Sequence, residues 1–151
     1  MAKIATLCHI LDDGKLLLIK KKRGIGAGFW NAAGGKVEEG EDIRDAAIRE
    51  VREEVGLTPI NPEKIGALDF YFGNELFMVV HVFLSREFGG VAMETDEALP
   101  RWFHVNDIPY NEMWQDDLHW VPVMLRNEKF TGKFYFDEHG KKLLRHELKS
   151  A

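Results

Sequence analysis

The stretch that decides the fold runs from Gly34 to Leu57 and reads GGKVEEGEDIRDAAIREVREEVGL. It begins with a glycine-rich loop, and the residues from about Asp42 to Val55 are predicted to form a helix. Apolar side chains recur along this helix at intervals of four, at Ile43, Ala47, Val51 and Val55, with Ala46 and Ile48 beside them. Such a stripe is typical of a helix that packs on a core. Gly56 suits the left-handed position after the last turn, so we expect the helix to end there.

The same helix carries three acidic residues near its end, at Glu50, Glu53 and Glu54. Residues three and four apart on a helix are neighbours, so these carboxylates repel one another unless a cation joins them. Oxygen ligands at this density suit Mg²⁺ or Mn²⁺ rather than zinc. The alternative is a solvated acidic face offset by Arg49 and Arg52, which is the usual meaning of such helices. The glycine loop in front of the helix favours the metal site.

Composition predicts one soluble domain. The 151 residues are 45% hydrophobic and 30% charged, which fits a single globular domain over residues 1–151, with no interdomain linker. The net charge of −5 argues against a stable nucleic-acid partner, although a single nucleotide carried with its own metal remains compatible. Cys8 is the only cysteine, and no run of residues approaches a membrane-spanning length. We therefore expect a cytoplasmic protein without a membrane partner, and a monomer by default.

The remaining chain alternates between strand-like and helix-like segments. Strands are predicted at residues 4–11, 15–20, 64–72, 76–84, 130–136 and 141–148. A second helix is predicted within Met113 to Arg126, where Pro122 either kinks it or lies in its first turn. Arg86 to Gly90 is interpreted as a loop. Strands on both sides of two helices indicate one layered α/β or α+β domain.

The central stretch matches a known motif. Gly35, five residues, Glu41, seven residues, Arg49-Glu50-Val51, one residue, Glu53-Glu54, one residue and Gly56-Leu57 form a complete Nudix box, with nine specified positions over 23 residues. The chain thus resembles the Nudix hydrolases. This resemblance implies an α+β fold, an α/β/α sandwich with a mixed central sheet and the Nudix helix packed on it. The implied reaction is metal-dependent hydrolysis of a nucleoside diphosphate linked to some further group.

The resemblance also implies residue roles. The metal ligands would be the Gly35 carbonyl and the carboxylates of Glu50, Glu53 and Glu54, with Mg²⁺ as the ion and Mn²⁺ as an alternative. Glu53 would be either a ligand or a participant in water activation. Arg49 would hold a glutamate in position, or form an ordinary i,i+4 pair with Glu53. Glu41 is interpreted as a helix-start residue that braces the loop.

Two further charged residues complete this expected site. Glu97 is the candidate for an additional metal ligand or base from outside the motif, and its alternative is a surface acid in a polar loop. Lys21 is the candidate for a phosphate contact, although a basic run such as Lys21-Lys22-Arg23 at a strand end is often just solvated.

Outside the box, the chain resembles the MutT-homologue oxidised purine nucleoside triphosphatases. The matching segments are residues 21–24, 26–28, 30–31, 80–83, 102–103, 113–114 and 116–117. That branch cleaves 8-oxo-dGTP or 2-oxo-dATP to the monophosphate and pyrophosphate. A flat purine needs an aromatic face and polar groups at its edge. The expected substrate-binding residues, besides Lys21, are Thr6, Asn31, Phe70, Phe72, Met78, Trp114, Asp116 and Asp117.

Several alternatives stay open. Ile25 stands where the branch has an aromatic pocket residue, and Ala32-Ala33 replaces a Gly-Phe pair, so the base preference is not settled by resemblance. Another nucleotide, such as a methylated purine triphosphate or a capped RNA end, is compatible with the box. So is a non-catalytic nucleotide-binding Nudix module. Trp120 is interpreted as a core residue of the second helix.

Overall fold

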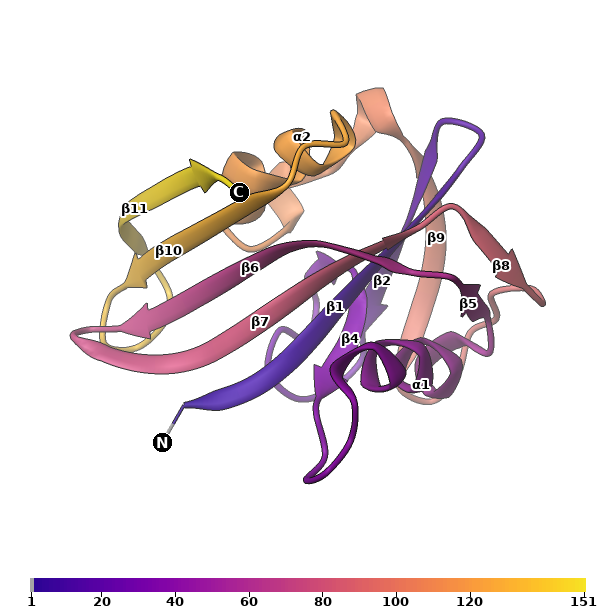
Figure 1. Cartoon of the computed structure of the whole chain (residues 1–151), viewed down its shortest axis with the longest axis horizontal. Coiled ribbons are helices and arrows are strands. Elements are labelled where there is room, and N and C mark those ends of the chain that lie inside the picture. The colour runs from indigo at the N-terminus through magenta and orange to yellow at the C-terminus, as the bar shows by residue number, and fades with distance from the viewer. Residues whose placement is uncertain (1) are drawn as a thin grey trace.

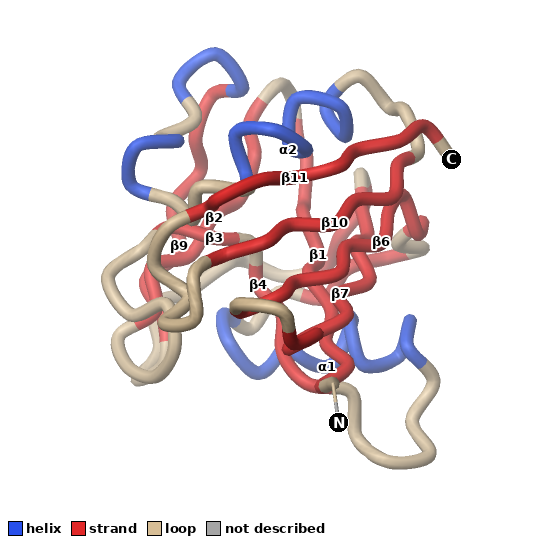
Figure 2. The backbone as a smooth tube through the Cα atoms, turned by 90° about the vertical axis from the view of Figure 1, so that its left-hand side faces the viewer, coloured by secondary structure: helices blue, strands red, loops and turns tan. Residues whose placement is uncertain are grey.

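The computed structural model describes residues 2–151, and over this range nine strands form a mixed sheet that lies between two α-helices (Figures 1 and 2). The helices are α1 (Ile43–Val55) and α2 (Asp117–Leu125). The sheet strands are β1 (Lys3–Asp12), β2 (Lys15–Lys21), β3 (Trp30–Asn31), β4 (Ala33–Lys36), β6 (Glu63–Phe72), β7 (Glu75–Ser85), β9 (Ala98–His104), β10 (Phe130–Phe136) and β11 (Leu143–Ser150). This confirms the predicted α+β class with a mixed central sheet and the Nudix helix packed on it.

The sheet is mixed because most neighbours are antiparallel but two pairs are parallel. The strand order is β11-β10-β6-β7-β1-β2-β3, with β4 paired to β1 and β9 paired to β2. Parallel pairing joins β1 to β7 and β6 to β10. Antiparallel pairing joins β1 to β2, β6 to β7 and β10 to β11, so the short turns at Asp13-Gly14, Gly73-Asn74 and residues 137–140 close three hairpins.

Both faces of the sheet are covered, and β2 shows why. Leu16 and Leu18 are buried in the core beneath α2, whereas Leu17 and Ile19 are buried in the core beneath α1. Successive side chains of a strand point to opposite faces, so a continuous apolar run is required where both faces are covered. The α2 core includes Trp120, Val121 and Met124, and the α1 core includes Ala47, Val51 and Val55.

Helix α1 begins and ends at residues that stabilise its exposed backbone groups. The Asp42 carboxylate accepts hydrogen bonds from the N–H groups of Arg44 and Asp45, at 3.0 and 3.2 Å. At the other end Gly56 is left-handed, with φ of 77°, and its N–H donates to the Arg52 carbonyl. These caps agree with the predicted bounds.

Two details differ from expectation. Arg86 to Gly90 is not a loop: β8 (Glu87–Gly89) pairs with β5 (Thr58–Ile60) in a small separate sheet. The Ser85 hydroxyl donates to carbonyls of Ile60 and Glu87, which holds the two short strands together. Strand β9, which pairs with β2 over its whole length, was not anticipated. Of the two positions expected for Pro122, the structure shows the one inside the helix, since Pro122 lies within α2.

No helix within residues 2–151 combines the length and apolar character needed to cross a bilayer.

Candidate active site

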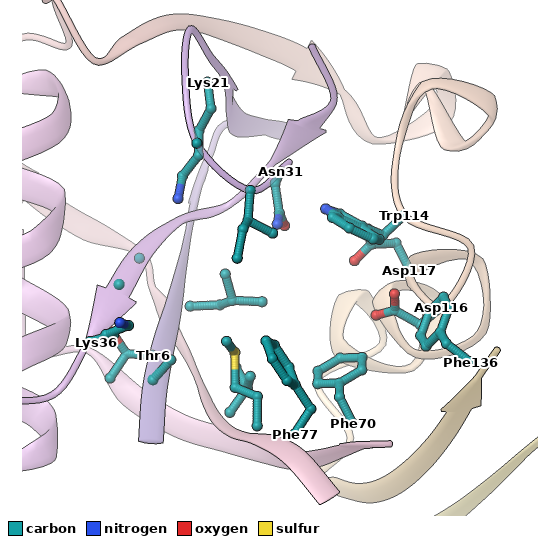
Figure 3. A pocket seen from close by; sticks show the side chains of 18 of the residues that line it. Thr6, Lys21, Asn31, Lys36, Phe70, Phe77, Trp114, Asp116, Asp117 and Phe136 are labelled. Carbon is teal, nitrogen blue, oxygen red and sulfur yellow. The ribbon is translucent and has the colours of Figure 1, made fainter. Parts of the chain in front are cut away.

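A pocket of about 320 Å³ opens between the sheet, the loop before β3 and the start of α2 (Figure 3). All the residues predicted to bind substrate line it: Thr6, Lys21, Asn31, Phe70, Phe72, Met78, Trp114, Asp116 and Asp117. They come from segments as far apart in sequence as β1 and α2. The structure therefore brings the whole predicted set together.

Other residues of the lining were missed from sequence, among them Arg23, Lys36, Phe77, Val80 and Phe136. Successive side chains of a regular strand point to opposite faces. A regular β7 that points Met78 into the pocket would therefore point Phe77 away from it. The β6–β7 register shifts between Phe70 and Tyr71, and this irregularity brings Phe77 to the same side. Phe136 was detectable, since it continues the alternating buried series of β10.

The two ends of the pocket differ in chemistry (Figure 3). Rings line one end, where Phe72 and Phe77 stack at 4.2 Å between centroids and Trp114 meets Phe136 edge-on at 6.3 Å. Lys21 and Lys36 lie toward the other end, nearer to α1. One end thus suits a flat apolar group and the other an anionic group.

A pair of buried acids lies beside Trp114. Asp116 and Asp117 are 4% and 1% exposed. The Trp120 indole N–H donates to Oδ2 of Asp116 at 2.8 Å, whereas Oδ2 of Asp117 has no hydrogen-bond partner within the described chain. Trp120 is fully buried, as predicted for a core residue, and it also orients an acid of the pocket. A buried carboxylate oxygen without a partner is costly, so it fits a site that receives a polar ligand.

Burial changes the protonation of both acids. Loss of solvation raises the pKa of Asp116 to about 6. Burial also raises the pKa of Asp117 well above its ordinary value, and the neighbouring Asp116 charge adds to this effect. Two carboxylates this close disfavour double ionisation. The pair can therefore hold a proton near neutral pH and offer a donor as well as acceptors.

Two smaller polar groups complete the ligand-facing surface. Asn31 accepts the N–H of Ala32 on its side-chain oxygen at 2.8 Å, so its NH₂ is the group it offers to a ligand. The hydroxyl oxygen of Thr6 is buried and has no partner within residues 2–151. Both residues line the pocket.

The three glutamates of α1 have different surroundings. Glu54 is 4% exposed and accepts the N–H of Gly34 at 2.8 Å, which ties the glycine loop to the helix. Burial raises the pKa of Glu54 to about 7. Burial also raises the pKa of Glu50, although the hydrogen bond from Arg49 opposes the shift. The Glu53 side chain is 54% exposed.

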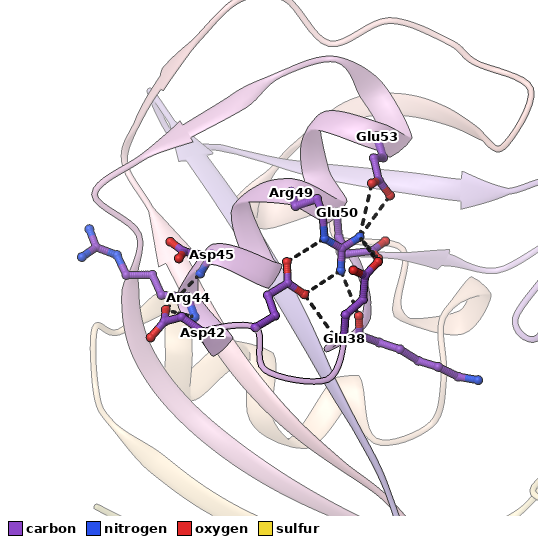
Figure 4. A network of polar contacts seen from close by, with 9 residues as sticks. Glu38, Asp42, Arg44, Asp45, Arg49, Glu50 and Glu53 are labelled. Carbon is purple, nitrogen blue, oxygen red and sulfur yellow. Dashed lines mark hydrogen bonds and ion pairs between the residues drawn. The ribbon is translucent and has the colours of Figure 1, made fainter.

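Arg49 is the centre of a polar network (Figure 4). Its guanidinium holds Glu41 through two hydrogen bonds, at 2.8 and 3.0 Å. The same group donates to Glu50 at 2.8 Å and to Glu53 at 3.2 Å. A further bond reaches the Lys36 carbonyl. Arg49 thus contacts Glu50 and also forms the i,i+4 pair with Glu53, and Glu41 joins the network from the loop.

Glu97 is placed next to this group by Thr95, a residue that the sequence did not point to. The Thr95 hydroxyl donates to the Glu54 carbonyl at 2.7 Å and accepts the N–H of Glu97 at 3.2 Å. The charge of Glu97 contributes to the raised pKa of Glu54. Lys21 acts on the same carboxyl in the opposite direction. Glu97 is exposed, and the structure brings it near Glu54.

The residues fit a divalent cation, although within residues 2–151 no three acidic, histidine or cysteine side chains already converge on one point. The hard oxygen donors are present on adjacent turns. Gly35 provides a cradle for them, because a Cβ there would collide with the Glu50 carboxyl group. The raised pKa values of Glu50 and Glu54 indicate carboxylates whose charge lacks full compensation, and a cation would supply it.

Comparisons with known proteins identify a family and several relatives. A family model described as the NUDIX domain matches residues 1–124. The chain is 45% identical over 139 residues to an oxidized purine nucleoside triphosphate hydrolase from Danio rerio, covering 91% of this chain and 89% of that protein. A protein of the same description from Mus musculus is 42% identical over 138 residues, covering 91% and 88%. The solved structure of a MutT protein from Bacillus halodurans is 26% identical, covers 97% of both chains and superposes with a TM-score of 0.86.

The cradle at Gly35 yields a first prediction. Gly35→Ala should abolish most of the hydrolytic activity and leave the fold intact. The new methyl group would displace the Glu50 carboxyl group, which is a side-chain group, so the backbone need not move. The rate of substrate hydrolysis measures the effect on activity, and the midpoint of thermal unfolding measures the effect on the fold. Gly89→Ala is the matched control, since its Cβ meets nothing within 4 Å. Full activity of Gly35→Ala would show that the position of Glu50 is unimportant.

The buried acid pair yields a prediction about stability and pH. Between the ordinary aspartate pKa of 3.8 and the folded value of about 6 for Asp116, the folded chain binds more protons than the unfolded chain. The free energy of unfolding should therefore be highest below pH 3.8, as far as this pair is concerned, and fall as the pH rises through 6. Asp117→Asn removes one acid of the pair and should flatten this fall in urea unfolding measured across the range.

The control is Asp137→Asn. Hydrogen bonding to backbone N–H, chiefly that of Lys141, lowers the pKa of Asp137, so its contribution changes below 3.8 and should not alter the slope above it. An Asp117→Asn slope equal to that of the parent chain would contradict the assigned protonation.

Proposed function

The chain belongs to the Nudix family of hydrolases, and we propose that it hydrolyses oxidised purine nucleoside triphosphates to the monophosphate and pyrophosphate. The proposed substrates are 8-oxo-dGTP and 2-oxo-dATP. The observation that carries the proposal is the Asp117 carboxylate, buried with an unpartnered oxygen beside Trp114 in the pocket. Two relatives more than 40% identical to the chain bear the name of this activity.

The base end explains how an oxidised purine would be recognised. The face of Trp114 stacks on the base, and Phe70, Phe72 and Met78 form the walls around it. Asp116 and Asp117 read the polar edge, and Asn31 supplies a further donor. Because the acid pair can share one proton, it can match edges that present different patterns of donors and acceptors. Such a pair suits both 8-oxoguanine and 2-oxoadenine.

The phosphate end carries the cations of the pocket. Lys21 and Lys36 lie at this end, and Arg23 is a further cation of the pocket lining. Nudix hydrolases generally use a divalent metal ion, and we propose Mg²⁺, with Mn²⁺ as an alternative. Gly35, Glu50, Glu53, Glu54 and Glu97 would hold it. When bound, such an ion neutralises phosphate charge and lowers the pKa of water.

The chain's own groups orient this reaction centre. Arg49 keeps Glu50 and Glu53 on one side of α1, and the Gly34 N–H fixes Oε1 of Glu54. The second oxygen of Glu54 is then the one that takes part in ion binding or accepts a proton. Glu97, held through Thr95, adds negative charge beside it. Lys21 offsets the repulsion between these acids and the incoming phosphates.

This reaction removes damaged precursors from the nucleotide pool and so prevents DNA damage. We propose that residues 1–151 act as a single Nudix domain, as a monomer, on free nucleotides in the cytoplasm.

Glu54→Gln tests the enzyme assignment. The glutamine oxygen can still accept the Gly34 N–H, so the fold and base pocket should persist while turnover falls by orders of magnitude. The assay incubates 8-oxo-dGTP with Mg²⁺ and separates monophosphate plus pyrophosphate from diphosphate plus phosphate. Glu63→Gln, at an exposed position on β6, is the control. A parent chain that binds nucleotides but turns over none of a panel, including methylated purine triphosphates and capped RNA, would favour a binding module.

Asp117→Asn tests whether Asp117 recognises the purine base. An asparagine cannot exchange a proton, so the ratio of kcat/KM between 8-oxo-dGTP and 2-oxo-dATP should change. The ratio is insensitive to the folded fraction of the preparation, which separates this effect from stability. An unchanged ratio would remove the acid pair from base recognition.

A further inference from the structure

Phe29 is an exposed aromatic residue next to the base pocket but not part of its lining. Its side chain is 41% exposed, and its ring lies 5.4 Å from that of Trp114 at an interplanar angle of 47°. Tilted aromatic pairs at this separation attract one another beyond the area they bury. The ring of Phe29 is therefore placed to support the indole from the side of the glycine loop.

The loop before β3 is shaped around that indole. Gly24, Gly26 and Gly28 all have positive φ, at 84°, 85° and 88°. These glycines lie within two overlapping turns, in which the Ala27 N–H donates to the Gly24 carbonyl and the Phe29 N–H donates to the Gly26 carbonyl. A Cβ on Gly26 would lie 3.2 Å from Nε1 of Trp114. The loop backbone thus runs directly against Trp114, and only glycine combines this closeness with this conformation.

Trp114 has a second support across the pocket. Phe136 meets it edge-on at 6.3 Å from β10. The indole is therefore contacted by the glycine loop and Phe29 on one side and by Phe136 on another. The start of the loop is fixed near the phosphate end, because the Lys22 N–H donates to the Glu97 carbonyl and the Gly28 N–H donates to the Lys21 carbonyl.

We propose that Phe29 is a positioning residue for base recognition: it braces Trp114 so that the indole face is already oriented when a purine enters. This inference rests on the proposed function only in that the pocket must bind a purine. Without Phe29, the indole of Trp114 would become ordered only when a purine binds. The free-energy cost of that ordering would weaken binding. The glutamates and Lys21 are untouched, so the chemical step should keep its rate.

The test measures Kd for the monophosphates 8-oxo-dGMP and dGMP, together with KM and kcat for 8-oxo-dGTP. Phe29→Ala should raise Kd and KM roughly three- to tenfold, the range expected for one aromatic pair, with kcat nearly unchanged. Phe29→Tyr retains the ring and should restore parent values. Phe88→Ala is the matched control, since it removes a similar contact, 5.6 Å and 36° from Trp102, away from the pocket.

A double-mutant cycle completes the test. In a Trp114→Ala background, Phe29→Ala should add little, because the group it braces is gone. Equal losses with and without Trp114, or an unchanged Kd in Phe29→Ala, would overturn the proposal. Thermal unfolding reports whether each variant is folded, and Phe29→Leu replaces Phe29→Ala if the latter is not. A parent chain with equal activity toward 8-oxo-dGTP and dGTP would refute the proposed function, yet weaker dGMP binding by Phe29→Ala would still support the brace.

Discussion

The hydrogen bond from the Gly34 N–H to the Glu54 carboxylate joins the two parts on which the site depends, the strand β4 and the helix α1. A carboxylate that is 4% exposed loses most of its hydration, and one backbone N–H compensates only part of that loss. The remaining deficit appears as a pKa raised to about 7. The chain thus holds acidic groups in a place where a cation is the natural partner. Arg49 restrains Glu50 and Glu53 beside it and is itself anchored by Glu41.

The sheet connects this acidic end with the base pocket. β1 pairs with β4 on one side and β7 on the other, so Thr6, Gly35 and His81 lie in one row across the sheet. The proposed phosphate end and the aromatic end are therefore joined through the same sheet, and α2, on the face of the sheet opposite α1, adds Asp117. Two kinds of buried acid result. The acids of α1 lie where we propose that a cation and phosphates bind. The acids at the start of α2 lie beside aromatic rings, and a proton shared between them reduces the charge that is buried there.

Much of this arrangement was predictable from the sequence, and the omissions have physical causes. The glycine loop, the amphipathic stripe and the spacing of Glu50, Glu53 and Glu54 are local features, and they predict α1 and its role directly. Phe77 escaped because a register shift breaks the period of two along β7. β8 was not predicted because its three residues are too few to show a period of two in hydrophobicity. Its pairing with β5 also depends on tertiary contacts. Thr95 escaped because its importance lies in a hydrogen bond to the Glu54 carbonyl, 41 positions away.

The most direct measurement is kcat/KM of the parent chain for 8-oxo-dGTP beside that for dGTP, with Mg²⁺ present. A buried acid pair that reads the oxidised edge predicts a preference of about tenfold or more for 8-oxo-dGTP, the size of one good hydrogen bond to a charged group. The products should be the monophosphate and pyrophosphate. Equal kcat/KM values for the two nucleotides would contradict recognition of the oxidised base by Asp116 and Asp117.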